Sequence, residues 1–344
     1  MESKYDRRDF LRLLALSGVS YVGSSLQERA PVWAQTAPNT VIFASTPGGA
    51  VSYSFELTEQ LGIGRKHGID VRLKRITSPP DAENSVVLGT TDGYSWSPVS
   101  VIRANRQGHK IRLIGPSIFL HTSLLVRTDS PYRRLEELKG KKIATLSKVT
   151  GAYTGFAVWG RMMGFDIDKD FQLVLTGSGP AMRALLQRKD VEAITMFESF
   201  TSVMVAGNEA RVLLDFNRAW VEATKTPGFN ALGLAVRQQW IDENPARAKA
   251  MSTTVLETLR AFHSNPDKYL NTPLAENFLG VKTPEAKKLL RARLLELYPT
   301  EWTEEIVQAG RLFAEKTSEL GLLEGGRATR QEIDAVFPKE FIQR

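Results

Sequence analysis

Short apolar runs rich in β-branched residues alternate with longer helical patterns between Val41 and about Phe216. This alternation is typical of βαβ units built on a parallel sheet. Strands are predicted at 40–45, 69–76, 91–96 and 110–115, and again at 141–146, 171–175, 191–197 and 210–216. Each run of the second quartet starts about 100 residues after its counterpart in the first. The chain is therefore expected to form two lobes with the same internal layout.

Two segments are expected to connect the lobes. The run "HTSLLVRTDSPYRRLEELKG" ends its apolar part at Ser130-Pro131, and "NALGLAV" resumes a buried strand pattern after Pro227-Gly228. We place the first lobe at 40–125 together with 228–344, and the second lobe at 126–227.

The segment after Asn244 is helical in pattern. The three longest stretches are "NPARAKAMSTTVLETLRAFHS", "TPEAKKLLRARLLELY" and "TEEIVQAGRLFAEKTSELG". Each opens with an Asn or Thr cap followed closely by Pro or Glu. We expect these C-terminal helices to pack on the first lobe.

The N-terminus has the order of an export signal. Arg7 and Arg8 precede an apolar region from Leu11 to Val22, and a Val-x-Ala end closes at Ala34. The apolar region is too short to span a membrane. Residues 1–34 are interpreted as a twin-arginine signal that is cleaved after Ala34. The alternative is an amphipathic helix that happens to begin with Arg-Arg.

Composition narrows the function classes. With 344 residues, 42% hydrophobic and 24% charged, the chain is expected to be a soluble globular protein. Its net charge of +7 is scattered, and no Lys/Arg block alternates with aromatic residues, so no nucleic-acid partner is expected. The absence of cysteine excludes disulfides, thiolate metal sites, a cysteine nucleophile and a lipidated N-terminal cysteine. We therefore expect an untethered protein of a Gram-negative periplasm.

The loops after the first strand of each lobe are candidates for ligand binding, because ligands of open parallel sheets bind at the carboxyl ends of the strands. In the first lobe, Ser45 and Thr46 precede two glycines at a probable helix start. In the second lobe the loop and first helical turn supply hydroxyls, a positive charge and free N–H groups suited to an anion. The candidates there are Ser147, Lys148, Thr150, Gly151 and Tyr153. The alternative for both loops is an ordinary strand-to-helix turn with a Ser/Thr cap.

The loops after the third strands supply different chemistry. Tyr94, Ser95 and Trp96 offer aromatic faces and hydroxyls, whereas Glu198 offers a carboxylate that accepts hydrogen bonds from an amine or aminopyrimidine. Capping of the next helix is the alternative role for Glu198. "TGSGPAM" is interpreted as a turn before a helix.

Catalytic motifs are absent from the sequence. The four histidines have no paired metal-ligand spacing, and there is no phosphate loop, dinucleotide fingerprint or nucleophile elbow. We expect no enzyme activity, no catalytic residue, no cofactor and no metal site.

The blocks "LTEQLGIGRKHGIDVRL", "RLEELKGKKIATLS", "MRALLQRKDVEAITMFE" and "QQWIDENPARAKAM", after an export signal, resemble periplasmic substrate-binding proteins of ABC importers in the nitrate/sulfonate/taurine group. The resemblance covers roughly residues 40–265. It implies a two-lobed α/β periplasmic-binding-protein-like fold of type II, with parallel-type sheets flanked by helices. It also implies a monomer that closes on a small-molecule solute and docks on a permease driven by an ATPase.

Carried over by position, the resemblance places seven residues in the cleft: Ser45, Thr46, Tyr94, Ser147, Thr150, Gly151 and Glu198. "TTDGYSWSP" departs from the small, alanine-rich loop of many members, which leaves the solute open. Because the candidate loops hold no arginine, we favour a small organic sulfonate or carboxylate. The alternative is a nitrogenous ring, such as a pyrimidine-type thiamine precursor or a flavin. The chain also resembles the yeast-type enzyme that makes the thiamine pyrimidine, without its cysteine-rich motif, and the effector domains of LysR-type regulators, without their helix-turn-helix.

Overall fold

The computed structural model describes residues 39–343. The predicted export signal at 1–34 lies outside the described residues. Within them, no helix is long and apolar enough to cross a membrane.

The first group of strands forms two small sheets. β1 (Thr40–Ser45) pairs in parallel with β2 (Asp70–Arg75). β10 (Leu232–Arg237) lies between β3 (Tyr94–Trp96) and β4 (Ile111–Ile118) and is antiparallel to both. A bridge between Phe43 and Gly93 connects β1 to the start of β3.

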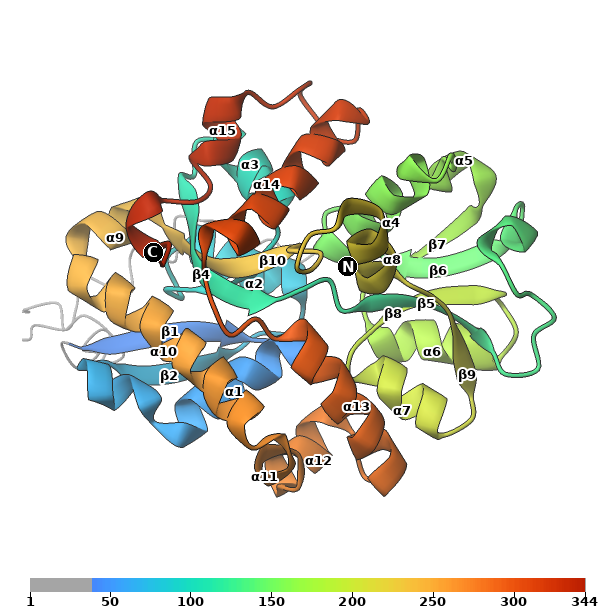
Figure 1. Ribbon diagram of the computed structural model, residues 1–344, viewed down its shortest axis with the longest axis horizontal. Coiled ribbons are helices and arrows are strands. Elements are labelled where there is room, and N and C mark those ends of the chain that lie inside the picture. The colour runs from blue at the N-terminus through green and yellow to red at the C-terminus, as the bar shows by residue number, and fades with distance from the viewer. Residues whose placement is uncertain (1–38, 344) are drawn as a thin grey trace, which may run out of the picture. The chain divides into compact units, whose positions relative to one another are not determined.

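The second group forms one five-stranded sheet with the order β7-β6-β8-β5-β9. The strands are β5 (Thr122–Arg127), β6 (Lys142–Leu146), β7 (Gln172–Thr176), β8 (Ala193–Phe197) and β9 (Ala210–Asp215). β6 is parallel to β7 and β8, and β5 is antiparallel to β8 and β9. Figure 1 shows α4 and α8 on one side of this sheet and α6 and α7 on the other.

The predicted α/β class is confirmed, and all eight predicted runs form strands. The sheets are mixed: β1 is parallel to β2 and β6 is parallel to β7 and β8, whereas β5 and β10 run antiparallel to their neighbours. A continuous apolar run predicts a buried strand, but it does not encode the direction of that strand. Sheet membership changes between β4 and β5 and again between β9 and β10. The lobe boundaries at 125/126 and 227/228 stay a prediction.

The helices flank these sheets. They are α1 (Ala50–Leu61), α2 (Pro79–Val87), α3 (Pro98–Arg106), α4 (Gly151–Met162), α5 (Ile167–Asp170), α6 (Gly179–Gln187), α7 (Phe200–Ala206), α8 (Phe216–Thr224), α9 (Gln238–Glu243), α10 (Pro245–Ser264), α11 (Pro266–Leu270), α12 (Pro273–Leu279), α13 (Pro284–Leu297), α14 (Glu304–Glu319) and α15 (Arg330–Asp334). Short 3₁₀ turns are η2 (Ile63–His67), η3 (Leu135–Leu138) and η4 (Lys339–Phe341).

Serine caps followed by proline start several of these helices. Ser78, Ser97 and Ser178 each accept a hydrogen bond from a backbone N–H three residues later, with a proline in the first turn. The cap satisfies an otherwise free N–H, and proline has no N–H to leave unpaired at this position. These local rules fix where the helices begin, and so where the loops before them lie.

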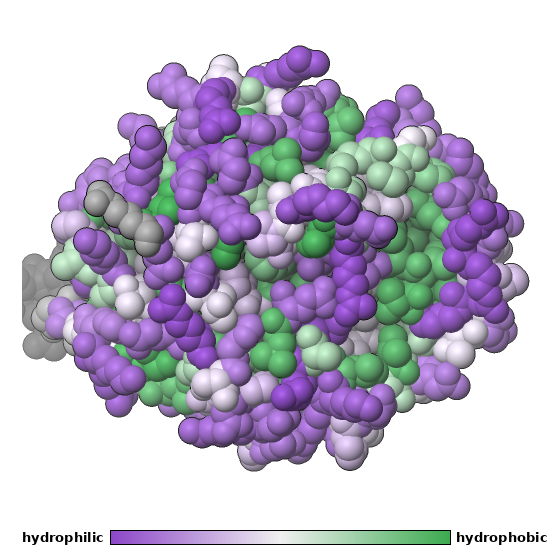
Figure 2. All heavy atoms as spheres, in the orientation of Figure 1, coloured by the Kyte–Doolittle hydropathy of each residue, from purple (hydrophilic) through white to green (hydrophobic). Residues whose placement is uncertain are grey.

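Buried aromatic side chains stabilise the second group of strands. Phe156 and Trp159 on α4 are buried and contact Phe216 at ring-centroid distances of 5.3 and 5.9 Å, as expected for core residues. Charged and polar residues cover most of the face seen in Figure 2. Exposed large hydrophobic side chains include Leu175 and Val212 on the five-stranded sheet.

The C-terminal helices contact both groups of strands. α10 packs on β4 and α1, and α14 packs on α3, whereas α13 contacts α7, a helix beside the five-stranded sheet. Through Arg293, α13 also reaches Glu198, which follows β8, and Asp215, which ends β9. The assignment of these helices to the first lobe stays a prediction.

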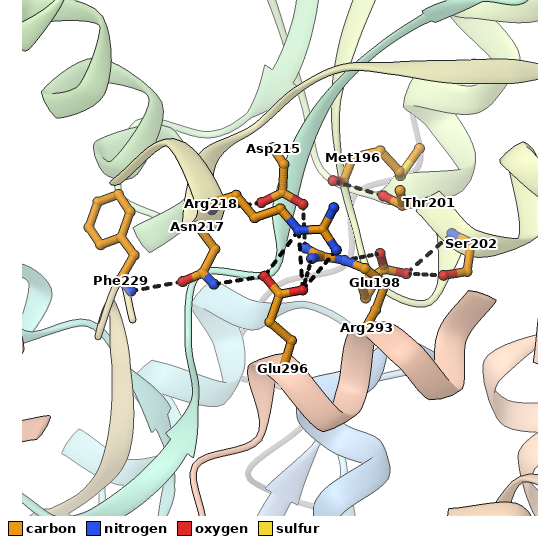
Figure 3. A network of polar contacts seen from close by, with 10 residues as sticks. All are labelled: Met196, Glu198, Thr201, Ser202, Asp215, Asn217, Arg218, Phe229, Arg293 and Glu296. Atoms are coloured by element: carbon orange, nitrogen blue, oxygen red, sulfur yellow. Dashed lines mark hydrogen bonds and ion pairs between the residues drawn. The ribbon is translucent and has the colours of Figure 1, made fainter. Parts of the chain in front are cut away.

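Arg293 is the centre of a largely buried ion network (Figure 3). Its guanidinium lies 2.6 Å from Asp215 Oδ2, 2.7 Å from Glu296 Oε2 and 3.4 Å from Glu198 Oε1. The exposed fraction is 12% for the Arg293 side chain and 0% for that of Glu198. Ser202 donates to the other oxygen of Glu198 at 2.7 Å. One cation thus compensates several carboxylates that water does not reach well.

Replacing Arg293 by methionine is expected to lower the free energy of unfolding by about 3 kcal/mol or more. The substitution keeps an apolar stem but leaves buried carboxylates without a counter-charge. Urea denaturation at pH 7 measures the effect. Arg291→Met is the matched control on the same helix, because Arg291 pairs with Asp267 where both side chains are about half exposed. That change is expected to cost less than about 1 kcal/mol. Equal losses in the two variants would contradict the assignment.

Candidate functional site

A cavity of about 210 Å³ lies where loops from both groups of strands meet. The first group supplies the loop after β1, the start of α2 and strand β3. The second group supplies the loops after β6, β7 and β8. These are carboxyl ends of strands, where open α/β sheets bind ligands.

Five of the ten predicted site residues line this cavity: Thr46, Tyr94, Ser95, Thr150 and Gly151. Their hydroxyl groups already have protein partners. Thr46 Oγ1 lies 3.4 Å from the Tyr94 hydroxyl, and Ser95 Oγ donates to Ser117 at 2.7 Å. Thr150 donates to a backbone carbonyl and caps α4. These side chains shape the wall more than they offer free hydrogen-bonding groups.

Four other predicted residues lie outside the lining. Ser45 donates to Glu56 at 2.7 Å beneath the loop. Lys148 and the Tyr153 hydroxyl both contact Asp168 at 2.7 Å. The backbone carbonyl of Ser147 accepts a hydrogen bond from the Thr150 hydroxyl within the turn.

Glu198, the tenth residue, lies behind the cavity wall. Its carboxylate points to Ser202 and Arg293 (Figure 3). Burial raises the pKa of the Glu198 carboxyl, against the effect of these two partners. Its backbone contributes to the site instead, because its carbonyl accepts from Ala50 N at 2.9 Å and its N–H donates to the His121 carbonyl at 3.0 Å. The role of Glu198 as a ligand contact stays a prediction, without support from the direction of its side chain.

The glycines of the first loop are required by its shape. Gly48 and Gly49 have φ values of +71° and +82°, a region that side chains with a Cβ rarely adopt. A Cβ on Gly48 would also lie 3.5 Å from the Phe200 ring. The two glycines let the loop turn close to α7 before α1 begins.

Phe197 and Phe200 form an aromatic wall of the cavity. Their rings pack edge to face at 5.2 Å, and His121 packs against Phe197 at 6.0 Å. Leu146 and Leu232 add aliphatic surface. A flat or apolar part of a ligand would find contact here.

His121, which packs against Phe197, is a further residue of the cavity lining. The residue is 8% exposed, and its Nδ1 has no hydrogen-bond partner among the described residues. Burial, together with the nearby charge of Arg293, lowers the pKa of His121 to about 4. The imidazole is therefore neutral at pH 7.

Glu83 is the one carboxyl side chain among the described residues that line the cavity, and no Lys or Arg is among them. It projects from α2 and is partly buried. No hydrogen bond or ion pair to its carboxyl forms within residues 39–343. Burial raises the pKa of Glu83 to about 8, although Arg103 acts in the opposite direction.

Sequence analysis missed the loops after the second strand of each quartet. Ser78 and Pro79 follow β2, and Ser178, Gly179 and Pro180 follow β7, about 100 residues later. Pro79, Gly179 and Pro180 line the cavity. Two signals in the sequence could have identified these loops. One is the spacing of about 100 residues that predicted the two quartets, and the other is the serine followed closely by proline that both loops share.

The chain belongs to the family described as NMT1/THI5 like, whose model matches residues 58–269. No curated protein matches the sequence. The fold is similar to that of the alkanesulfonate-binding protein SsuA from Xanthomonas axonopodis pv. citri bound to MOPS, with 14% identity, a TM-score of 0.69, and coverage of 90% of this chain and 100% of that one.

Two further structures show the same fold. The periplasmic aliphatic sulphonate-binding protein SsuA from Escherichia coli has 17% identity and a TM-score of 0.68, over 88% of this chain and 93% of that one. The periplasmic nitrate-binding protein NrtA from Synechocystis PCC 6803 has 15% identity and a TM-score of 0.65, over 88% of this chain and 87% of that one. The periplasmic-binding-protein fold predicted from the sequence is thus confirmed.

Replacing Glu83 by glutamine is expected to change how stability depends on pH. A carboxyl with a pKa near 4.5 when unfolded and about 8 when folded binds its proton more tightly in the folded state. It therefore lowers the free energy of unfolding as pH rises from about 4.5 to 8. The free energy of unfolding of Glu83→Gln, taken relative to that of the wild type, should therefore increase by at least about 1 kcal/mol from pH 5 to pH 8.

Urea denaturation at the two pH values measures this difference. His121, whose folded pKa is lowered, has the opposite sign between about pH 4 and 6.5, but it is present in both proteins and cancels. Glu136→Gln makes the same chemical change on an exposed turn and should follow the wild type. Parallel pH profiles for Glu83→Gln and wild type would show that Glu83 is not in a desolvating site.

Proposed function

We propose that this protein is the solute-binding component of an ABC importer. It captures a small solute in the cavity and delivers the solute to a membrane permease driven by an ATPase. The observation that carries the proposal is the cavity itself, lined by strand-end loops from two groups of strands. The family and the shared fold of solute-binding proteins support it.

Closure of two lobes is part of the proposal. The segments 40–125 and 228–344 would form one lobe and 126–227 the other, with the solute binding between them. A solute that contacts both lobes shifts the population toward the closed form, because it binds that form better. The changes of sheet membership at β4–β5 and β9–β10 support these connections.

The remaining expectations fit this role. The protein would reach the periplasm through the twin-arginine pathway, act as a monomer and carry out no chemical reaction. The described lining residues include no serine or cysteine paired with a histidine base, which is the arrangement that activates a nucleophile.

The solute would be small. The cavity, at about 210 Å³, is smaller than the roughly 300–1,000 Å³ of pockets for drug-sized ligands. Both solute classes left open by the sequence, a small organic anion and a nitrogenous ring, can meet this limit. An anion would rely on hydroxyls and on N–H groups at the starts of α1, α4 and α6.

A thermal-shift panel tests the proposed function. The purified protein is heated with sulfonates, carboxylates, nitrate, amines and pyrimidines, and a solute at about a hundred times its Kd should add roughly 2.7 kcal/mol. The solute should be recovered chemically unchanged. Consumption of the solute would instead indicate an enzyme on this fold, and a panel without any shift would contradict the proposed function.

A variant that fills the cavity identifies the binding site. Ala152, in the first turn of α4, lines the cavity, and Ala152→Phe should abolish the shift produced by the solute. Ala181→Phe is the control, since Ala181 lies exposed in the first turn of α6 and outside the lining. A shift that persists in Ala152→Phe would place the solute elsewhere.

A further inference from the structure

We infer that Glu83 selects a solute that carries N–H donors, such as a protonated amine, an amidine or an amino-substituted ring, over a small organic anion. The inference rests on the proposed function and names the class of solute. It replaces Glu198, whose carboxylate is engaged behind the wall, by a carboxyl that lines the cavity.

The first argument concerns unused hydrogen-bonding capacity. The hydroxyls of Thr46, Ser95 and Thr150 are engaged with protein partners. By contrast, the partly buried Glu83 carboxyl lines the cavity without a hydrogen bond or ion pair among the described residues. A polar group buried without a partner is costly, so binding that supplies one is favourable. In the free protein the Glu83 carboxyl holds its proton up to about pH 8. A cation or N–H donor favours its ionised form, which only accepts hydrogen bonds, so the complementary ligand of that form is a donor.

The second argument concerns charge. Among the described residues, the cavity lining has one acidic side chain and no basic one. The cation that acts on Glu83 is Arg103, which lies outside the lining and donates to the Leu322 carbonyl at 3.3 Å. An entering sulfonate or carboxylate would face Glu83 without a counter-charge in the lining, whereas a cation would pair with it.

The third argument concerns position. Glu83 on α2 and Tyr94 on β3 both line the cavity, and α2 packs against β3. The two residues thus share one part of the wall, with the Phe197 and Phe200 rings also in the lining. A planar nitrogenous group bound to Glu83 would therefore have aromatic surface within the same cavity. Such a site rejects an analogue that leaves its buried acceptor unpaired.

Pairs of ligands with the same shape but opposite chemistry test the inference. Benzamidine is compared with benzoate, ethylamine with ethanesulfonate, and 4-aminopyrimidine with pyrimidine, by isothermal titration calorimetry at pH 9, where the Glu83 carboxyl is mostly ionised. We expect the N–H member to bind better in at least one pair. Glu83→Gln should then weaken that member about tenfold or more, because a charge-assisted hydrogen bond is lost.

Two further variants make the result specific. Glu136→Gln, the exposed control, should bind as the wild type does. His121→Phe should weaken binding but keep the preference for N–H donors, whereas Glu83→Gln should lose that preference. Circular dichroism of each variant checks the fold.

The pH profile of affinity is a second readout, since a cation should bind more tightly as pH rises through the range in which Glu83 loses its proton. The other titratable groups that line the cavity, Tyr94 and His121, do not change charge there.

The outcomes separate this inference from the proposed function. Binding of a sulfonate or carboxylate that Glu83→Gln leaves unchanged or strengthens would overturn the inference and keep the solute-binding role. Failure of every N–H ligand to bind at millimolar concentration would also overturn it. If no ligand of either class binds, both the inference and the proposed function are contradicted.

Discussion

The buried charge of Glu198 constrains the loop on which the candidate site depends. A carboxylate with no exposed surface must be compensated, and Arg293 from α13 supplies the cation while Ser202 supplies hydrogen bonds. The backbone of Glu198 also forms hydrogen bonds with Ala50 at the start of α1 and with His121, the residue before β5. An interaction outside the cavity thus fixes the segment that carries Phe197 and Phe200 into it.

This arrangement separates structural charge from ligand chemistry. The ions around Arg293 are engaged with one another behind the wall, whereas Glu83 on α2 lines the cavity without a hydrogen bond or ion pair among the described residues. The buried Nδ1 of the neutral His121 imidazole also has no partner among these residues. A site with so few free polar groups specifies its ligand mainly by shape and by one or two hydrogen bonds.

Much of the fold could be predicted from the sequence because its signals are local. Alternating apolar runs located the strands, and Asn-Pro and Thr-Pro patterns located helix starts such as those of α10 and α13. The antiparallel direction of β5 and the contact of α13 with α7 could not be predicted, because both depend on partners distant in the sequence.

The candidate site was predictable by region but not by side chain. Position at strand ends identified Thr46, Tyr94 and Thr150, which line the cavity. Pattern alone could not show that Glu198 turns toward Arg293. Glu83 was missed because it lies in a polar helical segment that resembles a solvated surface, and its partial burial comes from the packing of α2 on β1, β3 and β10.

A crystal structure of the protein grown with the solute that gives the largest thermal shift tests the central claim most directly. The account predicts electron density for that solute in the cavity, between the loop of Gly48 and Gly49 and the Phe197 and Phe200 rings. It also predicts a donor of the solute within hydrogen-bond distance of Glu83. A solute bound at another surface, with this cavity filled only by water, would contradict the account.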